Sequence, residues 1–180
     1  MVARAVFLDR DGVLNEALVE QNKPVAPRRV EDFRVYPETA PALERLKAAG
    51  FLLIVVTNQP DVARGEVPRA VVDEMNRRLR ESLPMLDDIC VCWEDGDASP
   101  CRKPKPGMVL DAAAKYGIDL KSSFLVGDRW RDIDCGANAG VRTVLIDRHW
   151  HERASDHPPD FRAPHITGAV ECILTAAGVS

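Results

Sequence analysis

Short runs of apolar and β-branched residues recur along this 180-residue chain, and more polar segments separate them. Continuous apolar runs of this length are typical of strands that are buried on both faces of a sheet. The longest run, Phe51 to Val56, is far too short to span a bilayer. The pattern therefore predicts strands at residues 3–8, 51–56, 88–92, 123–127 and 142–146.

The segments between these runs have apolar residues at helical spacing and end at glycine or proline. Residues 39–50 begin with Thr39, a candidate N-cap, and stop at Gly50. Residues 68–84 lie between two prolines and carry a stripe of apolar side chains. Three shorter helices are predicted at residues 106–117, 132–140 and 168–178, and a polar surface loop at residues 148–165.

Strands that alternate with helices predict a parallel sheet reached through right-handed crossovers. We therefore expect one α/β domain over residues 1–180, a doubly wound Rossmann-like sheet with helices on both faces. In such sheets, ligands bind beyond the carboxyl ends of the strands. Functional side chains should therefore follow the strands directly.

The composition is 46% hydrophobic and 29% charged, which is ordinary for a globular protein and excludes a disordered chain. A net charge of -4 argues against a nucleic-acid binder, which usually has a basic face. No signal-like apolar segment precedes the first predicted strand, and no membrane association is expected. We expect a cytoplasmic protein that is a monomer or a weak homo-oligomer.

Polar residues follow four of the five predicted strands. Carboxylates beside open positions suit Mg²⁺, and neighbouring cations suit a phosphoryl group. Asp9 and Asp11 are one residue apart, so their like charges must be offset by something positive. The residues at this predicted rim are Asp9, Asp11, Thr57, Asn58, Arg102, Lys103, Asp128 and Asp132.

The stretches FLDRDG, VVTNQ, RKPKPG and LVGDRWRD resemble, in order, the four motifs of the haloacid dehalogenase (HAD) superfamily of aspartate-nucleophile phosphatases. The opening DRDGVLN, the ARG that follows TNQ, and CRKPKPGM are most similar to phosphatases of heptose bisphosphate and of histidinol phosphate. The resemblance implies a Mg²⁺-dependent phosphomonoesterase that acts on a small phosphorylated substrate.

Roles follow from this resemblance, motif by motif. Asp9 would be the nucleophile and Asp11 the general acid and base, with Thr57 and Lys103 holding the phosphoryl oxygens. Magnesium would be bound by the Asp9 carboxylate, the Asp11 backbone carbonyl and Asp128. Asp132 would orient Lys103 or a metal-bound water. The substrate-binding residues implied in the same way are Asn15, Asn58, Arg102 and Arg129.

Each of these residues also has a purely structural interpretation. Aspartates after a strand often cap a turn, and a threonine that closes a strand is common. A basic loop such as that of Arg102, Lys103 and Lys105 is often only solvated. The four histidines fit no ligand spacing and are expected at the surface.

Three of the five cysteines, Cys90, Cys92 and Cys101, fall within twelve residues. In a cytosolic chain this clustering favours metal binding over disulfides. The related heptose phosphatases carry a structural zinc loop here, so these three thiolates are candidate zinc ligands. The alternative is a loop without metal, in which the cysteines are small apolar residues.

The segment at residues 16–37 is too short for the folded cap domain of many superfamily members, so we expect an open site without a large cap. It is longer than the resemblance to heptose enzymes implies, and Arg28 and Arg29 either meet a second phosphate or form a solvated turn. A phosphomutase fits less well because it usually needs a closing cap. A non-catalytic phospho-ligand binder and a dehalogenase fit less well still.

Overall fold

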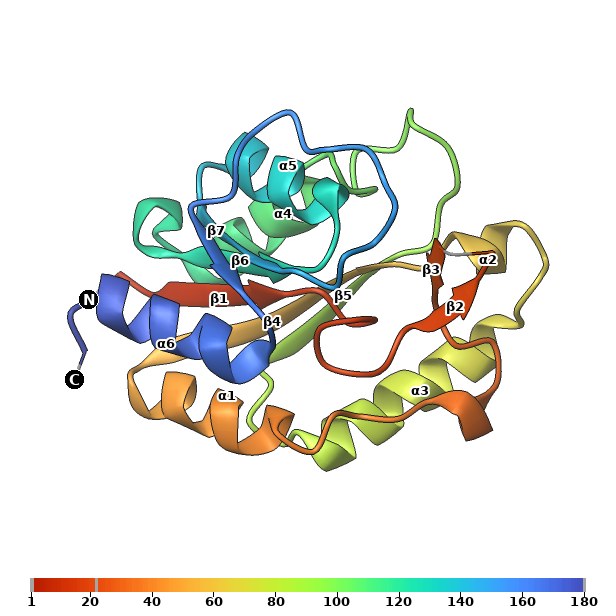
Figure 1. Ribbon diagram of the computed structural model, residues 1–180, viewed down its shortest axis with the longest axis horizontal. Coiled ribbons are helices and arrows are strands. Elements are labelled where there is room, and N and C mark those ends of the chain that lie inside the picture. Colours follow the sequence, from red (N-terminus) through yellow and green to blue (C-terminus); the bar gives the residue numbers. More distant parts are fainter. Residues whose placement is uncertain (1, 22, 180) are drawn as a thin grey trace.

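The computed structural model describes residues 2–21 and 23–179, and its central element is a six-stranded parallel sheet with order β5-β4-β1-β6-β7-β8 (Figure 1). Its strands are β1 (Arg4–Leu8), β4 (Phe51–Asn58), β5 (Asp88–Cys92), β6 (Phe124–Gly127), β7 (Arg142–Ile146) and β8 (Phe161–Ala163). The chain builds outward from β1 in one direction to β4 and β5, and in the other to β6, β7 and β8. The strand order therefore reverses beside β1, where a ligand site is expected.

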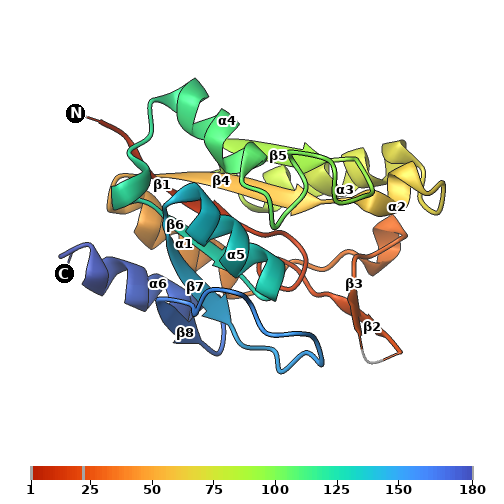
Figure 2. The same ribbon diagram turned by 90° about the horizontal axis from the view of Figure 1, so that it is seen from above.

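Helices cover both faces of the sheet (Figures 1 and 2). On one face lie α1 (Thr39–Ala48), α3 (Arg69–Ser82) and α6 (Ile166–Ala176), and on the other α4 (Gly107–Tyr116) and α5 (Trp130–Ala139). Alternation along β1 divides its side chains between two cores: Val6 and Leu8 pack in the first, Ala5 and Phe7 in the second. None of the described helices is long and apolar enough to cross a membrane.

The five predicted strands and five predicted helices are all present, and the predicted fold class is confirmed. The predicted N-cap of α1 is wrong: Glu38 precedes the helix, and Thr39 is its first residue. The Thr39 hydroxyl instead donates to the carbonyl of Leu14 at 3.2 Å. The predicted surface loop at residues 148–165 contains the short strand β8, whose three residues carry too little pattern to be recognised.

The segment at residues 16–37 forms no domain of its own. It contains the antiparallel hairpin β2 (Leu18–Glu20) and β3 (Lys23–Val25), followed by a 3-10 turn at Val30–Asp32. The hairpin and the short helix α2 (Pro60–Ala63) stand beyond the carboxyl ends of the strands (Figure 2). Both lie at one end of the molecule, and the two chain termini lie at the other (Figure 1).

Candidate active site

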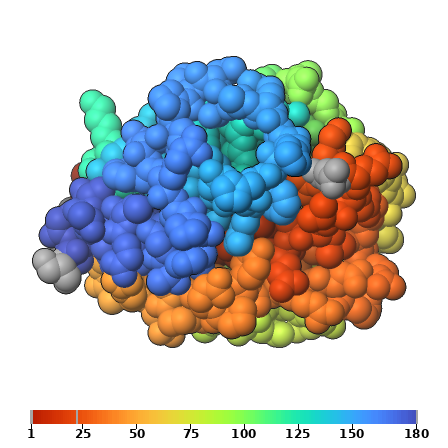
Figure 3. Space-filling view, in the orientation of Figure 1, coloured from red at the N-terminus to blue at the C-terminus, as the bar shows by residue number. Residues whose placement is uncertain are grey.

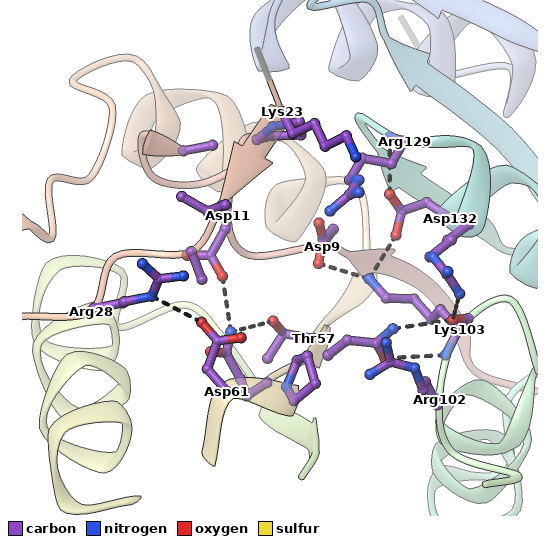
Figure 4. Close-up of a pocket in the computed structure, with 18 of the residues that line it drawn as sticks. Asp9, Asp11, Lys23, Arg28, Thr57, Asp61, Arg102, Lys103, Arg129 and Asp132 are labelled. Atoms are coloured by element: carbon purple, nitrogen blue, oxygen red, sulfur yellow. Dashed lines mark hydrogen bonds and ion pairs between the residues drawn. The ribbon is translucent and has the colours of Figure 1, made fainter. Parts of the chain in front are cut away.

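A cavity of about 340 Å³ opens at the carboxyl edge of the sheet (Figure 4). Its floor comes from the ends of β1 and β4 and from the loop after β5, and the hairpin and the start of α5 form its walls. The polar residues lining it include Asp9, Asp11, Lys23, Arg28, Thr57, Asn58, Gln59, Asp61, Arg64, Arg102, Lys103, Arg129, Arg131 and Asp132. Most of the residues predicted at the rim therefore share one pocket.

Lys103 occupies the centre of the floor and is 2% exposed. Its ammonium donates to Asp9 Oδ1 at 2.7 Å and to Asp132 Oδ1 at 2.6 Å (Figure 4). It also donates to the Val56 carbonyl at 2.8 Å. Because an ammonium has three protons, every donor of Lys103 has a partner. The cation is thus held in one position beside the Asp9 carboxylate.

This burial shifts the ionisation of both partners. Desolvation raises the pKa of Asp9 to about 6; Lys103 opposes the shift, and the charges of Asp132 and Asp11 add to it. Burial alone would lower the pKa of Lys103, but the carboxylates of Asp132 and Asp9 raise it above its ordinary value. Lys103 is therefore a permanent cation, whereas Asp9 changes charge within reach of neutral pH.

Asp9, Asp128 and Asp132 each offer a carboxylate oxygen, and these atoms lie within 4.8 Å of one another. Asp128 is 4% exposed, and its Oδ1 has no hydrogen-bond partner among the described residues. A buried acceptor left unpaired is costly unless it meets a ligand. Burial raises the pKa of Asp128 well above its ordinary range, and Asp9 and Asp132 raise it further. This cluster of hard oxygens fits Mg²⁺.

Two glycines allow these carboxylates to lie so close to the backbone. A Cβ on Gly12, which has a φ of +89°, would lie 2.1 Å from Asp128 Oδ2. A Cβ on Gly127 would lie 2.0 Å from the Cβ of Asp132. Neither position can hold a side chain while the aspartates stay where they are.

A second cation, Arg10, binds the Asp11 carboxylate separately from Lys103. Arg10, which is fully buried, donates from Nε to both oxygens at 3.2 Å and from a terminal nitrogen at 3.0 Å. The other end of the guanidinium donates to Asn76 on α3 at 2.9 Å. Gln59 adds a bond to Asp11 at 2.9 Å. Each of the two neighbouring aspartates thus has its own cation, Arg10 for Asp11 and Lys103 for Asp9.

Asn15 was predicted to bind substrate, and the structure contradicts this. It is 0% exposed, does not line the pocket, and donates from Nδ2 to Asp11 Oδ1 at 2.9 Å. Its position one turn beyond Asp11 places it behind that carboxylate. Asn15 therefore positions Asp11.

Thr57 and Asn58 line the pocket side by side at the end of β4. The Thr57 hydroxyl accepts a bond from Gln59 at 3.0 Å, which leaves its own proton to donate into the pocket. Asn58 accepts from the backbone N–H of Lys103 and donates to its carbonyl, both at 3.1 Å. Both polar ends of Asn58 are therefore committed to Lys103, and its contribution is to hold that loop.

Arginines crowd the mouth of the pocket. Arg102 donates to the Glu94 carbonyl and pairs with Asp95 at 3.3 Å, but its buried Nε has no partner among the described residues. Arg129 pairs with Glu152. Burial, followed by the charges of Arg102 and Arg129, lowers the pKa of Arg131. Such an excess of cations favours an anionic ligand.

The walls formed by the hairpin contribute different cations. Arg28 pairs with Glu20 at 3.0 Å and with Asp61 and Glu66 at 3.4 Å, so three carboxylates already share its charge. Arg29 pairs with Asp32 and does not line the pocket. Lys23, which the sequence did not single out, lines the pocket opposite the floor (Figure 4).

The predicted zinc site is wrong. Cys92 and Cys101 form a disulfide, so neither has a thiolate to offer a metal. Cys90 packs with the core around Phe7, and burial raises the pKa of its thiol to about 11. Asp95, in the same loop, pairs with Arg64 at 2.7 Å. The spacing of these cysteines suits a disulfide as well as a metal, and the preference for metal was mistaken.

The residues at or behind the site that were not predicted from the sequence include Arg10, Lys23, Gln59, Asn76, Arg131 and Trp150. Gln59 lies within the recognised VVTNQ stretch and could have been found there. A charged Arg10 between two aspartates after a buried strand was a second available signal. Arg131 lies within the recognised LVGDRWRD stretch, whereas Asn76 and Trp150 reach the site across 66 and 22 residues and leave no local pattern.

Comparison with known proteins agrees with this geometry. Residues 100–169 match the HAD-hydrolase-like family model. A D-glycero-alpha-D-manno-heptose-1,7-bisphosphate 7-phosphatase from Photorhabdus laumondii is 34% identical over 160 residues, covering 82% of this chain and 84% of that protein. The D-glycero-D-manno-heptose-1,7-bisphosphate 7-phosphatase of Thermosynechococcus vestitus is 33% identical, with 95% of each chain covered.

Among solved structures, the D,D-heptose 1,7-bisphosphate phosphatase from Bordetella bronchiseptica, complexed with magnesium and phosphate, superposes with a TM-score of 0.82. It is 26% identical, and the match covers 97% of this chain and 99% of that one. The chain therefore belongs to the HAD superfamily of hydrolases. Within that superfamily it is a phosphatase, similar along most of its length to the heptose bisphosphate phosphatases.

Proposed function

We propose that this enzyme is a magnesium-dependent phosphomonoesterase that removes the 7-phosphate from D-glycero-D-manno-heptose 1,7-bisphosphate, as its relatives' names describe. The observation that carries the proposal is the buried Asp9, fixed against Lys103 and grouped with Asp128 and Asp132 at the floor of a pocket. The cationic mouth above it supports a substrate with a second negative group.

Asp9 attacks the phosphorus, the ester P–O bond breaks, and Asp11 gives a proton to the departing sugar oxygen. In the second step Asp11 takes a proton from water, whose oxygen attacks the aspartyl-phosphate and releases inorganic phosphate. Gln59, Asn15 and Arg10 hold the Asp11 carboxylate in position for both transfers. Magnesium bound by Asp9, the Asp11 carbonyl and Asp128 would supply positive charge to the phosphoryl oxygens.

Lys103 and Thr57 stabilise the charge that develops on the transferring phosphoryl group. Lys103 needs no reorientation, because Asp132 and the Val56 carbonyl already fix its ammonium. Lys103 contributes its positive charge, because all three of its protons already have partners, and Thr57 contributes a hydrogen bond. One well-placed group of this kind is commonly worth roughly 3 to 4 kcal/mol in the transition state. Asp132 thus acts through Lys103 as a positioning residue.

The mouth of the pocket favours a bisphosphate over histidinol phosphate. Arg131 is half-buried beside Arg102 and Arg129, and it has no carboxylate partner among residues 2–21 and 23–179. A second phosphate would offset the repulsion among these three guanidinium groups, whereas the protonated amine of histidinol phosphate would add to it. A cytoplasmic location and a monomeric or weakly associating state stay predictions.

A phosphate-release screen with Mg²⁺ tests the proposal. It compares the heptose 1,7-bisphosphate with histidinol phosphate and with several sugar monophosphates. We expect the bisphosphate to have the highest kcat/KM and Asp9→Asn to lose more than ~10³-fold in kcat. Preference for histidinol phosphate would overturn the substrate, and an active Asp9→Asn variant would overturn the mechanism.

A further inference from the structure

The chain that follows β7 turns back across the pocket end of α5 (Figures 1 and 3). Side-chain exposure alternates along residues 148–152: Arg148, Trp150 and Glu152 are half-buried, whereas His149 and His151 are exposed. The backbone is not a regular strand, because His149 has a φ of +58° and the Glu152 N–H donates to the Trp150 carbonyl at 2.9 Å, and these turns direct the three half-buried side chains toward the site. The polar composition that predicted a plain surface loop therefore includes two half-buried residues, Arg148 and Glu152.

Each inward-facing residue contacts an active-site element. The Arg148 Nε donates to the Gly12 carbonyl at 3.1 Å. The Trp150 indole Nε1 donates to Asp128 Oδ2 at 2.7 Å. Glu152 pairs with Arg129 at the start of α5. The stretch thus binds the loop after β1 and the loop after β6, which hold the proposed magnesium ligands.

The contact between Trp150 and Asp128 gives the two carboxylate oxygens different hydrogen-bond partners. Oδ2 accepts the indole proton, and Oδ1 has no hydrogen-bond partner among the described residues. An indole N–H is a donor only, so it cannot itself bind a cation. The indole is also neutral. It therefore orients the Asp128 carboxylate without neutralising its charge, whereas a lysine would neutralise it.

We propose that Trp150 is a positioning residue for the metal site: its indole fixes the Asp128 carboxylate so that Oδ1 faces the ion. This inference rests on the proposed magnesium dependence. Residues that hydrogen-bond a metal ligand typically change metal affinity by ~10–100-fold when removed. Trp150→Phe keeps an aromatic ring and removes the N–H donor, so Mg²⁺ should bind ~10–100-fold more weakly.

The primary experiment is calorimetric titration of the substrate-free protein with MgCl₂. Trp93→Phe is the matched control, because Trp93 stacks on Arg69 at the far edge of the sheet. We expect a raised Kd for Trp150→Phe and an unchanged Kd for Trp93→Phe. In activity assays the Mg²⁺ concentration for half activation should rise in parallel, while kcat at saturating Mg²⁺ stays within a few-fold of wild type.

A second measurement needs no change at Trp150. In the double variant Trp93→Phe/Trp130→Phe, Trp150 is the only remaining tryptophan, and its fluorescence should shift on Mg²⁺ addition because its hydrogen-bond partner binds the ion. Equal Kd values for Trp150→Phe and wild type would overturn the proposed role of Trp150 but not the metal site. Trp150 fluorescence that does not change on Mg²⁺ addition would have the same consequence. No Mg²⁺ binding by wild type would overturn the metal site itself, and this role with it.

Discussion

Lys103 at the floor of the pocket and Arg28 at its mouth are both cations that contact carboxylates, but their surroundings differ. The Lys103 side chain is 3% exposed and lies 2.6 to 2.7 Å from its two carboxylates. The Arg28 side chain is 38% exposed and lies 3.0 to 3.4 Å from its three. Exposed pairs of the second kind contribute ~0–1 kcal/mol each, whereas breaking a buried pair costs ~3–5 kcal/mol.

This difference indicates how the enzyme separates its tasks. The floor must hold charges at fixed distances during phosphoryl transfer, and burial makes any other arrangement costly. The mouth only has to attract and select an anion, so its exposed side chains can be exchanged without unfolding the protein. Mutations should therefore affect kcat and stability at the floor, and mainly KM at the mouth.

The largest effect is expected for Lys103→Met. It leaves the Asp9 and Asp132 carboxylates buried without a cation, so the free energy of unfolding should fall by ~3–5 kcal/mol. We expect kcat to fall by ~10²–10³-fold as well, because a preorganised charge is lost. Urea unfolding and steady-state kinetics measure both. Lys105→Met, on the same loop but exposed, is the control; equal losses in the two variants would remove the distinction between floor and surface.

The next effect concerns Arg10, which holds the proposed general acid. Arg10→Lys keeps the charge but loses the fork that binds both Asp11 oxygens and Asn76. For sugar phosphates, whose alkoxide leaving group needs a proton, kcat should fall by ~10–100-fold. For p-nitrophenyl phosphate, whose leaving group needs none, the fall should be much smaller. A uniform loss on both substrates would contradict this role; Arg77→Lys on the exposed face of α3 is the control.

A smaller effect, of up to ~10-fold per pH unit, is expected for Mg²⁺ affinity. The pKa of Asp9 is raised to about 6 in the metal-free protein, so below pH 6 a proton occupies a proposed ligand and must leave when magnesium binds. The Kd measured by calorimetry should therefore rise as the pH falls from 7 to 5, and the raised pKa of Asp128 acts in the same direction. A Kd that stays constant between pH 5 and 7 would show that Asp9 does not exchange a proton for the ion.

The smallest effect is expected for Lys23→Ala in the hairpin. An exposed lysine that meets only a second phosphate contributes ~0.5–1 kcal/mol, which corresponds to a ~2–5-fold rise in KM for the bisphosphate. KM for monophosphates, kcat and the unfolding free energy should not change. A fall in kcat would show that Lys23 acts on the chemical step, as the floor residues do. It would contradict the distinction between the floor and the mouth of the pocket. Val19→Ala, at an exposed position of the same hairpin, is the control.

The floor of the pocket could be predicted from the sequence because its residues follow strands. Apolar runs located the ends of β1, β4 and β6, and parallel strands bring their carboxyl ends to one edge. The sequence alone thus places Asp9, Thr57 and Asp128 together. The cationic loop after β5 placed Lys103 at the same edge, and the resemblance to the four motifs then implied its role.

What escaped prediction has no periodic signal. Trp150 and Asn76 reach the site through single contacts across 22 and 66 residues. A polar loop or an exposed helix face has no sequence pattern that predicts such a contact. Asn15 was assigned to the substrate because the number of residues after a strand does not say which way a side chain turns in a tight loop. The cysteine spacing failed for a different reason, since it satisfies a metal and a disulfide equally well.

Gly12 and Gly127 give the site a further property, which concerns its tolerance to random mutation. The space that a Cβ would fill at each position is taken by the carboxyl-bearing side chain of Asp128 or Asp132. In a saturation library selected for phosphatase activity, these two positions should accept as few replacements as the catalytic aspartates do, even alanine being excluded. The compactness of the anionic cluster is therefore encoded by two residues without side chains, and any redesign of the pocket has to leave them empty.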